Sequence, residues 1–65
     1  MIDYNLGLTK IKEGKFQEAT DLLSLAHAKY PKHPQILFSR GISRGFLENY
    51  TGAVADITRA IRLED

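Results

Sequence analysis

The sequence predicts an all-α fold of two tandem antiparallel helix hairpins, and three observations support this. The chain repeats with a period of 34 residues, apolar side chains recur at the three- and four-residue spacing of amphipathic helices, and glycine, proline and asparagine stand near the expected helix ends. The repeat superimposes three pairs of identical small residues: Gly7 on Gly41, Ala19 on Ala53, and Ala26 on Ala60. Large residues coincide by type: Tyr4 with Phe38, Leu8 with Ile42, Phe16 with Tyr50, and Leu23 with Ile57. We therefore expect one domain over residues 1–65, with its units near 1–33 and 34–65.

The first unit is expected to contain helices at 2–13 and 16–29. Gly14 separates them, because glycine adopts the left-handed backbone conformation at a helix C-terminus without a steric penalty. Pro31 ends the second helix, since proline has no backbone N–H to continue the hydrogen-bond ladder.

The second unit is expected to contain helices at 34–47 and 50–63. Pro34 suits the first helical position, where its missing N–H costs nothing. Asn49 precedes the last helix, and its side chain can accept a hydrogen bond from a free backbone N–H there.

Small residues are predicted at the point where the two helices of each unit cross. Gly7 and Ala19 mark this point in the first unit, and Gly41 and Ala53 mark it in the second. Without bulky side chains, the backbones can approach near the short end of the ~8–10 Å range of helix packing.

These positions resemble the tetratricopeptide repeat, a helix–turn–helix unit with small and large residues at these offsets. The first unit resembles it at Asn5-Leu6-Gly7, Gly14, Phe16, Ala19, Leu23, Ala26 and Pro31, and the second at Gly41, Tyr50, Ala53, Ile57, Ala60-Ile61 and Leu63. The resemblance covers nearly the whole chain and implies a fragment of a right-handed α-solenoid. Departures from the family pattern are Lys10 and Arg44 at an aromatic position, Arg40 in place of leucine, and Glu48 in place of a turn glycine.

The resemblance also implies a concave groove, lined by the first helix of each unit, that binds an extended peptide or a helix. Carried over position by position, the groove residues are Tyr4, Leu8, Ile11, Lys12, Gln35, Phe38, Ile42 and Phe46. Most of them are apolar, so an amphipathic helix or an apolar segment is the expected ligand. Some of them, Tyr4, Phe38 and Phe46 in particular, could instead pack within the domain. The family's carboxylate clamp for heat-shock chaperones is not expected, because its positions correspond to Tyr4, Leu8, Ser39 and Ile42.

A basic patch is a second candidate surface, formed by Lys10, Arg40 and Arg44. An acidic partner could pair with it. The alternative is a solvated face with an Arg44–Glu48 contact at i,i+4, worth a few tenths of a kcal/mol.

Several function classes are disfavoured by the composition. A net charge of +1 gives no general attraction to nucleic acid, no apolar run is long enough to span a membrane, and the absence of cysteine excludes disulfides and thiolate metal sites. Asp21, Ser24 and His27 recur every three residues, but a regular helix offers no free N–H groups for an oxyanion hole, and His27 and His33 lack a third metal ligand. We therefore expect no enzyme, metal or cofactor. The localisation stays open, with the cytoplasm favoured.

Two functions remain. The first is an adaptor that presents the groove to a protein or peptide partner. The second is a structural element that forms a homo-oligomer, because two units alone leave apolar positions of the last helix uncovered at Val54, Ile57 and Ile61.

Overall fold

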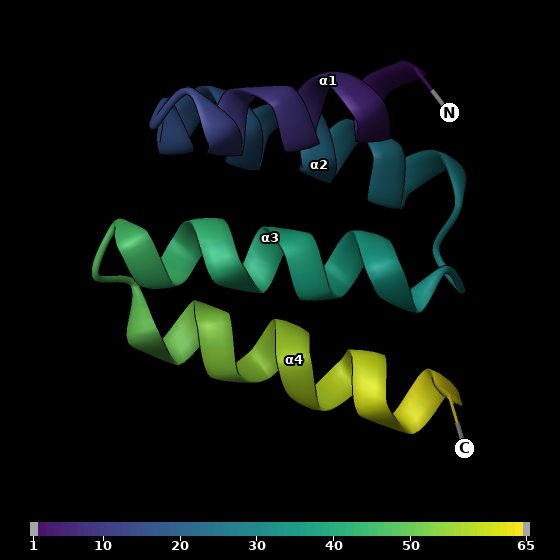
Figure 1. The fold of residues 1–65 in the computed structure, drawn as a ribbon. Coiled ribbons are helices and arrows are strands. Elements are labelled where there is room, and N and C mark those ends of the chain that lie inside the picture. The colour runs from purple at the N-terminus through teal and green to yellow at the C-terminus, as the bar shows by residue number, and fades with distance from the viewer. Residues whose placement is uncertain (1, 65) are drawn as a thin grey trace.

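The fold is all-helical, as the sequence predicts. The computed structural model describes residues 2–64, which form four α-helices and no strand (Figure 1). The helices are α1 (Ile2–Lys12), α2 (Phe16–Lys29), α3 (Pro34–Phe46) and α4 (Tyr50–Glu64). The expected ends differ from the observed ones by one residue at α1, α3 and α4.

Each helix packs against the next along the chain. Helix α2 contacts α1 on one side and α3 on the other, α3 contacts α4, and α1 meets α3 at only a few positions. Successive helices run in opposite directions (Figure 1). The buried core contains Leu23, Ile36 and Leu37, together with four alanines of α2 and α4: Ala19, Ala26, Ala53 and Ala60. The result is a slab of 31 × 26 × 15 Å.

Two helix contacts leave no room for a side chain, and each involves a glycine at a predicted position. A Cβ atom on Gly7 would lie 2.8 Å from Leu23 Cγ, and one on Gly41 would lie 2.9 Å from Ile57 Cγ1. Both distances are shorter than van der Waals contact, so a larger residue at either position would require the opposite side chain or its helix to shift. The predicted role of these glycines is confirmed.

The turn between α1 and α2 is a Schellman motif. The N–H of Lys15 donates to the carbonyl of Lys10 at 2.9 Å, and the N–H of Gly14 donates to the carbonyl of Ile11 at 3.0 Å. Gly14 has a φ of 78°, in the left-handed region that glycine adopts freely.

The turn between α3 and α4 repeats the same motif with a different residue in the left-handed position. The N–H of Asn49 donates to the carbonyl of Arg44 at 2.8 Å, and the N–H of Glu48 donates to that of Gly45 at 3.0 Å. Glu48 has a φ of 64°, so the turn keeps its geometry where glycine is missing. Asn49 Oδ1 accepts from the N–H of Gly52 at 3.2 Å, which confirms the predicted cap on α4.

Candidate functional site

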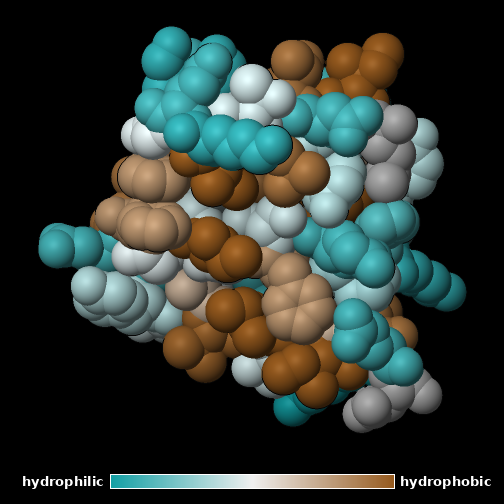
Figure 2. Space-filling view, in the orientation of Figure 1, coloured by the Kyte–Doolittle hydropathy of each residue, from teal (hydrophilic) through white to brown (hydrophobic). Residues whose placement is uncertain are grey.

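The most open part of the predicted groove lies on α3. Phe38, Ile42 and Phe46 follow one another at four-residue spacing, so they share a face of the helix. Phe38 is half-buried, Ile42 is 48% exposed and Phe46 is 61% exposed. Figure 2 shows apolar side chains gathered over α3 and α4, flanked by hydrophilic ones. We call Phe38, Ile42 and Phe46 the α3 surface.

The ring of Phe46 is held in place by an aromatic neighbour. It stacks on Phe16 of α2, with ring centroids 4.4 Å apart and planes inclined by 7°. This contact covers one face of the ring and leaves the rest open to solvent. A side chain that is already ordered loses little rotamer entropy when a partner binds, so Phe46 has the character of a binding anchor.

The groove residues of α1 are more covered than those of α3. Tyr4, Leu8 and Ile11 are half-buried, whereas Lys12 is exposed, as is Gln35 on α3. The ring centroids of Tyr4 and His33 lie 6.0 Å apart, and the two ring planes are inclined by 51°. The accessible apolar surface of the predicted groove therefore lies mainly on α3, and the α1 residues contribute less to it.

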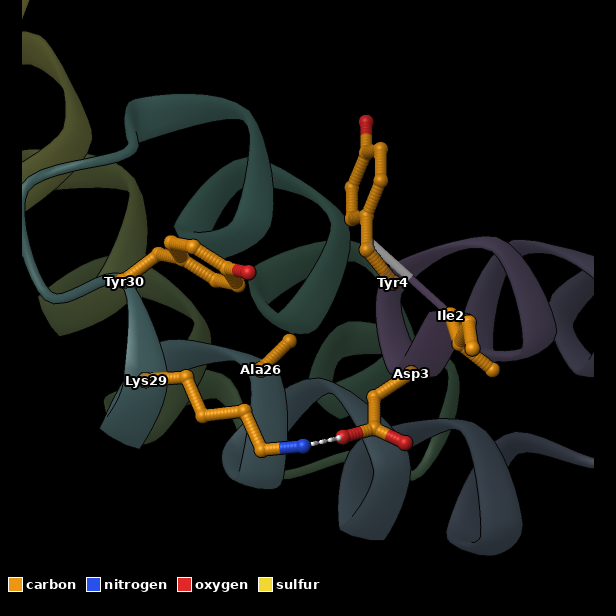
Figure 3. A pocket seen from close by; sticks show the side chains of 6 residues that line it. All are labelled: Ile2, Asp3, Tyr4, Ala26, Lys29 and Tyr30. Atoms are coloured by element: carbon orange, nitrogen blue, oxygen red, sulfur yellow. Dashed lines mark hydrogen bonds and ion pairs between the residues drawn. The ribbon is translucent and has the colours of Figure 1, made fainter.

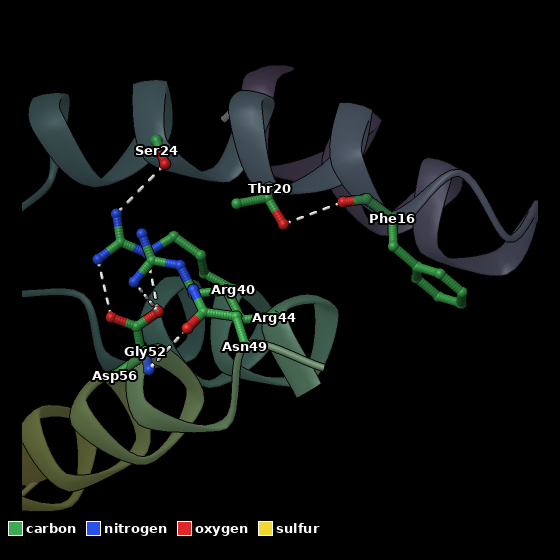
Figure 4. A network of polar contacts seen from close by, with 8 residues as sticks. All are labelled: Phe16, Thr20, Ser24, Arg40, Arg44, Asn49, Gly52 and Asp56. Atoms are coloured by element: carbon green, nitrogen blue, oxygen red, sulfur yellow. Dashed lines mark hydrogen bonds and ion pairs between the residues drawn. The ribbon is translucent and has the colours of Figure 1, made fainter. Parts of the chain in front are cut away.

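The predicted basic patch is wrong for Arg40 and Arg44, because an acidic side chain already binds both. Arg40 donates from Nε and Nη2 to the two carboxylate oxygens of Asp56, at 2.9 and 2.8 Å, and Arg44 Nη1 donates to Asp56 Oδ2 at 3.0 Å (Figure 4). Asp56 is only 2% exposed, and the Arg40 side chain is 11% exposed. A buried carboxylate requires such partners to offset the loss of hydration. The alternative contact of Arg44 with Glu48 is not formed either, and Lys10 pairs separately with Glu13 at 3.6 Å.

This ion cluster joins three helices. Arg40 and Arg44 lie on α3 and Asp56 on α4, and Arg40 Nη1 also donates to Ser24 Oγ of α2 at 3.3 Å (Figure 4).

Sequence reasoning missed Asp56, although the repeat carries a signal for it. A shift of 34 positions places Arg40 on Leu6 and Asp56 on Leu22. The second unit thus replaces two leucines by opposite charges, which is the pattern expected of two side chains that form an ion pair.

His27 lies beside this cluster, and the two polar residues near it on α2 have other partners. Ser24 accepts from Arg40, and Asp21 accepts from Gln17 at 3.1 Å. Burial lowers the pKa of His27 from its ordinary value of 6.5, and the positive charges of Arg40 and Arg59 lower it further. Asp56 opposes this shift.

Two of the three residues predicted for a self-association face are exposed. Val54 is 64% exposed and Ile61 is 52% exposed on α4. Ile57 is half-buried, because its side chain packs over Gly41 of α3. Ile57 therefore belongs to the contact between α3 and α4.

A pocket of about 280 Å³ lies between the start of α1 and the end of α2 (Figure 3). Lys29 Nζ donates to Asp3 Oδ2 at 2.9 Å on one side of it, and this hydrogen bond raises the pKa of Lys29. Tyr4 and Tyr30 are also among its lining residues. The pocket holds one cation and one carboxylate that neutralise each other, so it offers no unpaired charge to a ligand.

Among residues 2–64, no three His, Asp or Glu side chains are grouped to hold a metal ion, and no helix there is long and apolar enough to cross a membrane. The chain matches no protein-family model, no curated protein and no solved structure.

Proposed function

We propose that the chain is a non-catalytic protein-interaction module of the tetratricopeptide type, with the helix arrangement of an α-solenoid fragment. Its α3 surface binds the apolar face of a partner helix. Support comes from the repeat, from the two glycine contacts, and from Schellman motifs that recur 34 residues apart. The observation that carries the binding function is the open apolar stripe on α3, with Ile42 and Phe46 about half or more exposed.

An amphipathic helix fits this stripe better than an acidic peptide does. Arg40 and Arg44 on the same helix share the carboxylate of Asp56, which neutralises one of their two charges and holds both side chains, so they are less available to an acidic partner. Apolar contacts would supply about 25 cal/mol per Å² of buried surface. The partner is therefore expected to present apolar residues at positions i, i+3, i+4 and i+7 of a helix.

A displayed library of helical peptides tests the proposal. The wild-type chain is the bait, and the affinity of each selected peptide is measured by fluorescence polarisation for the wild type, for Ile42→Asp and for Val54→Asp. A charge at the centre of an apolar contact should weaken binding by about 30-fold or more. Ile42→Asp should show this loss, whereas Val54→Asp, at an exposed position on α4, should bind as the wild type does. Selected peptides that bind Ile42→Asp as tightly as the wild type would contradict the proposal.

A further inference from the structure

The contact between α2 and α3 within the chain shows how a similar contact could form between α4 and α1 of different copies. Phe16 of α2 stacks on Phe46, and Ser24 accepts from Arg40, so the face of α2 that carries Phe16, Thr20 and Ser24 is turned to α3. Thr20, between the other two, is only 8% exposed.

Helix α4 carries the same face, but it is uncovered. A shift of 34 positions takes Phe16, Thr20, Ser24 and His27 to Tyr50, Val54, Thr58 and Ile61. All four α4 residues are exposed, and Val54 is 64% exposed where Thr20 is 8% exposed. We call these four residues the tail face.

Helix α1 carries the complementary face, also uncovered. On α3, Ile36, Arg40 and Ser43 have the i, i+4, i+7 spacing of one face, and Arg40 shows that this face is turned to α2. The equivalent α1 residues are Ile2, Leu6 and Thr9, which we call the head face. Ile36 is 0% exposed, whereas Ile2 is 78% exposed.

We propose that the tail face of one copy binds the head face of a second copy, in the way that α2 binds α3 within the chain. The two faces are chemically suited to each other. The hydrogen-bonded pair of Arg40 and Ser24 would be replaced by Leu6 against Thr58, so no charge is buried there without a partner. Lys12 takes the position of Phe46 and would lie near the ring of Tyr50, where a cation is favourable.

Such a contact joins two different surfaces, so it does not close on itself. A dimer still has one free head face, on one copy, and one free tail face, on the other, so a third copy can bind. This distinguishes the proposal from a symmetric dimer through α4 alone, which would use Val54 and Ile61 of both copies and stop at two.

Sedimentation of the full chain tests the proposal. Wild-type protein, of 7.3 kDa, should gain average mass beyond that of a dimer between about 10 µM and about 1 mM. Val54→Asp and Leu6→Asp each destroy one face at an exposed position, so each variant alone should remain monomeric with unchanged helical circular dichroism. Ile42→Asp, on the α3 surface, should associate as the wild type does.

Mixing the two blocked variants is the decisive measurement. Val54→Asp keeps its head face and Leu6→Asp keeps its tail face, so an equimolar mixture should form a 1:1 dimer and nothing larger. Two results would overturn the proposal. One is a wild-type chain that is monomeric up to about 1 mM, as expected if a further repeat or another protein covers these faces. The other is a Leu6→Asp variant that still dimerises by itself, which indicates symmetric pairing through α4.

Discussion

Replacing Glu48 by glycine should stabilise the chain. Glu48 occupies the left-handed position of the second Schellman motif, with φ at 64°, whereas the equivalent position of the first motif is Gly14. The Glu48 side chain is exposed and forms no ion pair within residues 2–64. The substitution therefore removes a strained backbone conformation without removing a contact.

Two opposing effects set the magnitude. A residue with a Cβ atom costs about 1–2 kcal/mol in the left-handed region. Glycine loses more backbone entropy on folding, which costs about 0.5–1 kcal/mol. The net gain for Glu48→Gly is then about 0.5–1 kcal/mol. For a domain of this size it corresponds to a rise in Tm of about 2–8 °C.

Thermal unfolding followed by circular dichroism measures this gain. The Val54→Asp background is the appropriate one, because self-association would raise Tm with concentration. Glu48→Ala is the matched control: it removes the same charge but keeps a Cβ atom at positive φ, so its Tm should not rise. If Glu48→Ala raises Tm as much as Glu48→Gly does, the gain comes from the lost charge and the conformational reasoning is refuted.

Three further predictions concern the packing, the ion cluster and the pH dependence. Gly41→Ala should lower stability by about 1–3 kcal/mol, because its Cβ would overlap Ile57, whereas Gly45→Ala, with open space around its Cβ, should raise it by about 0.5 kcal/mol; equal urea midpoints for the two would contradict the close contact. Asp56→Ala leaves two arginines without their counter-ion and should lower the free energy of unfolding by about 3–5 kcal/mol, enough to leave much of a small domain unfolded at 25 °C. A Tm near that of the wild type would show that the cluster is not needed for stability. Burial and nearby arginines lower the pKa of His27 in the folded state, so the unfolded chain takes up the proton first and the free energy of unfolding should fall as pH drops below 6.5. His27→Gln should reduce the difference in this free energy between about pH 7.5 and about pH 5.5, measured by urea titration. An unchanged difference would exclude His27 as its source.

The helices and their close contacts could be predicted from the sequence because they depend on local rules. Gly14 and Asn49 act within a few residues of their position, through backbone conformation and a single side-chain hydrogen bond. Gly7 and Gly41 can be recognised because a small residue at the helix contact occurs twice, 34 residues apart in the chain. Such features require no knowledge of which distant residues meet.

The ion cluster could not be predicted in the same way, since it depends on three helices meeting. Charged side chains are usually solvated, so the sequence alone indicates a surface patch at Arg40 and Arg44. Their burial is determined by Asp56 on the next helix, at a position where the first unit has an apolar Leu22. Ile57 was misplaced for a related reason: the stripe of α4 identifies apolar positions but does not distinguish a residue that faces α3 from one that faces outward.

The bond from Arg40 to Ser24 makes the ion cluster a mechanical link between the two units. The Arg40 guanidinium group donates from Nη1 to Ser24 of α2 and from Nε and Nη2 to Asp56 of α4. Separating the second unit from the first would therefore also disturb the geometry around Asp56. Fraying of one unit is then coupled to the loosening of the other, and the protein should lose its structure in a single cooperative step. Amide protons of α2 and α4 should accordingly exchange with similar opening free energies.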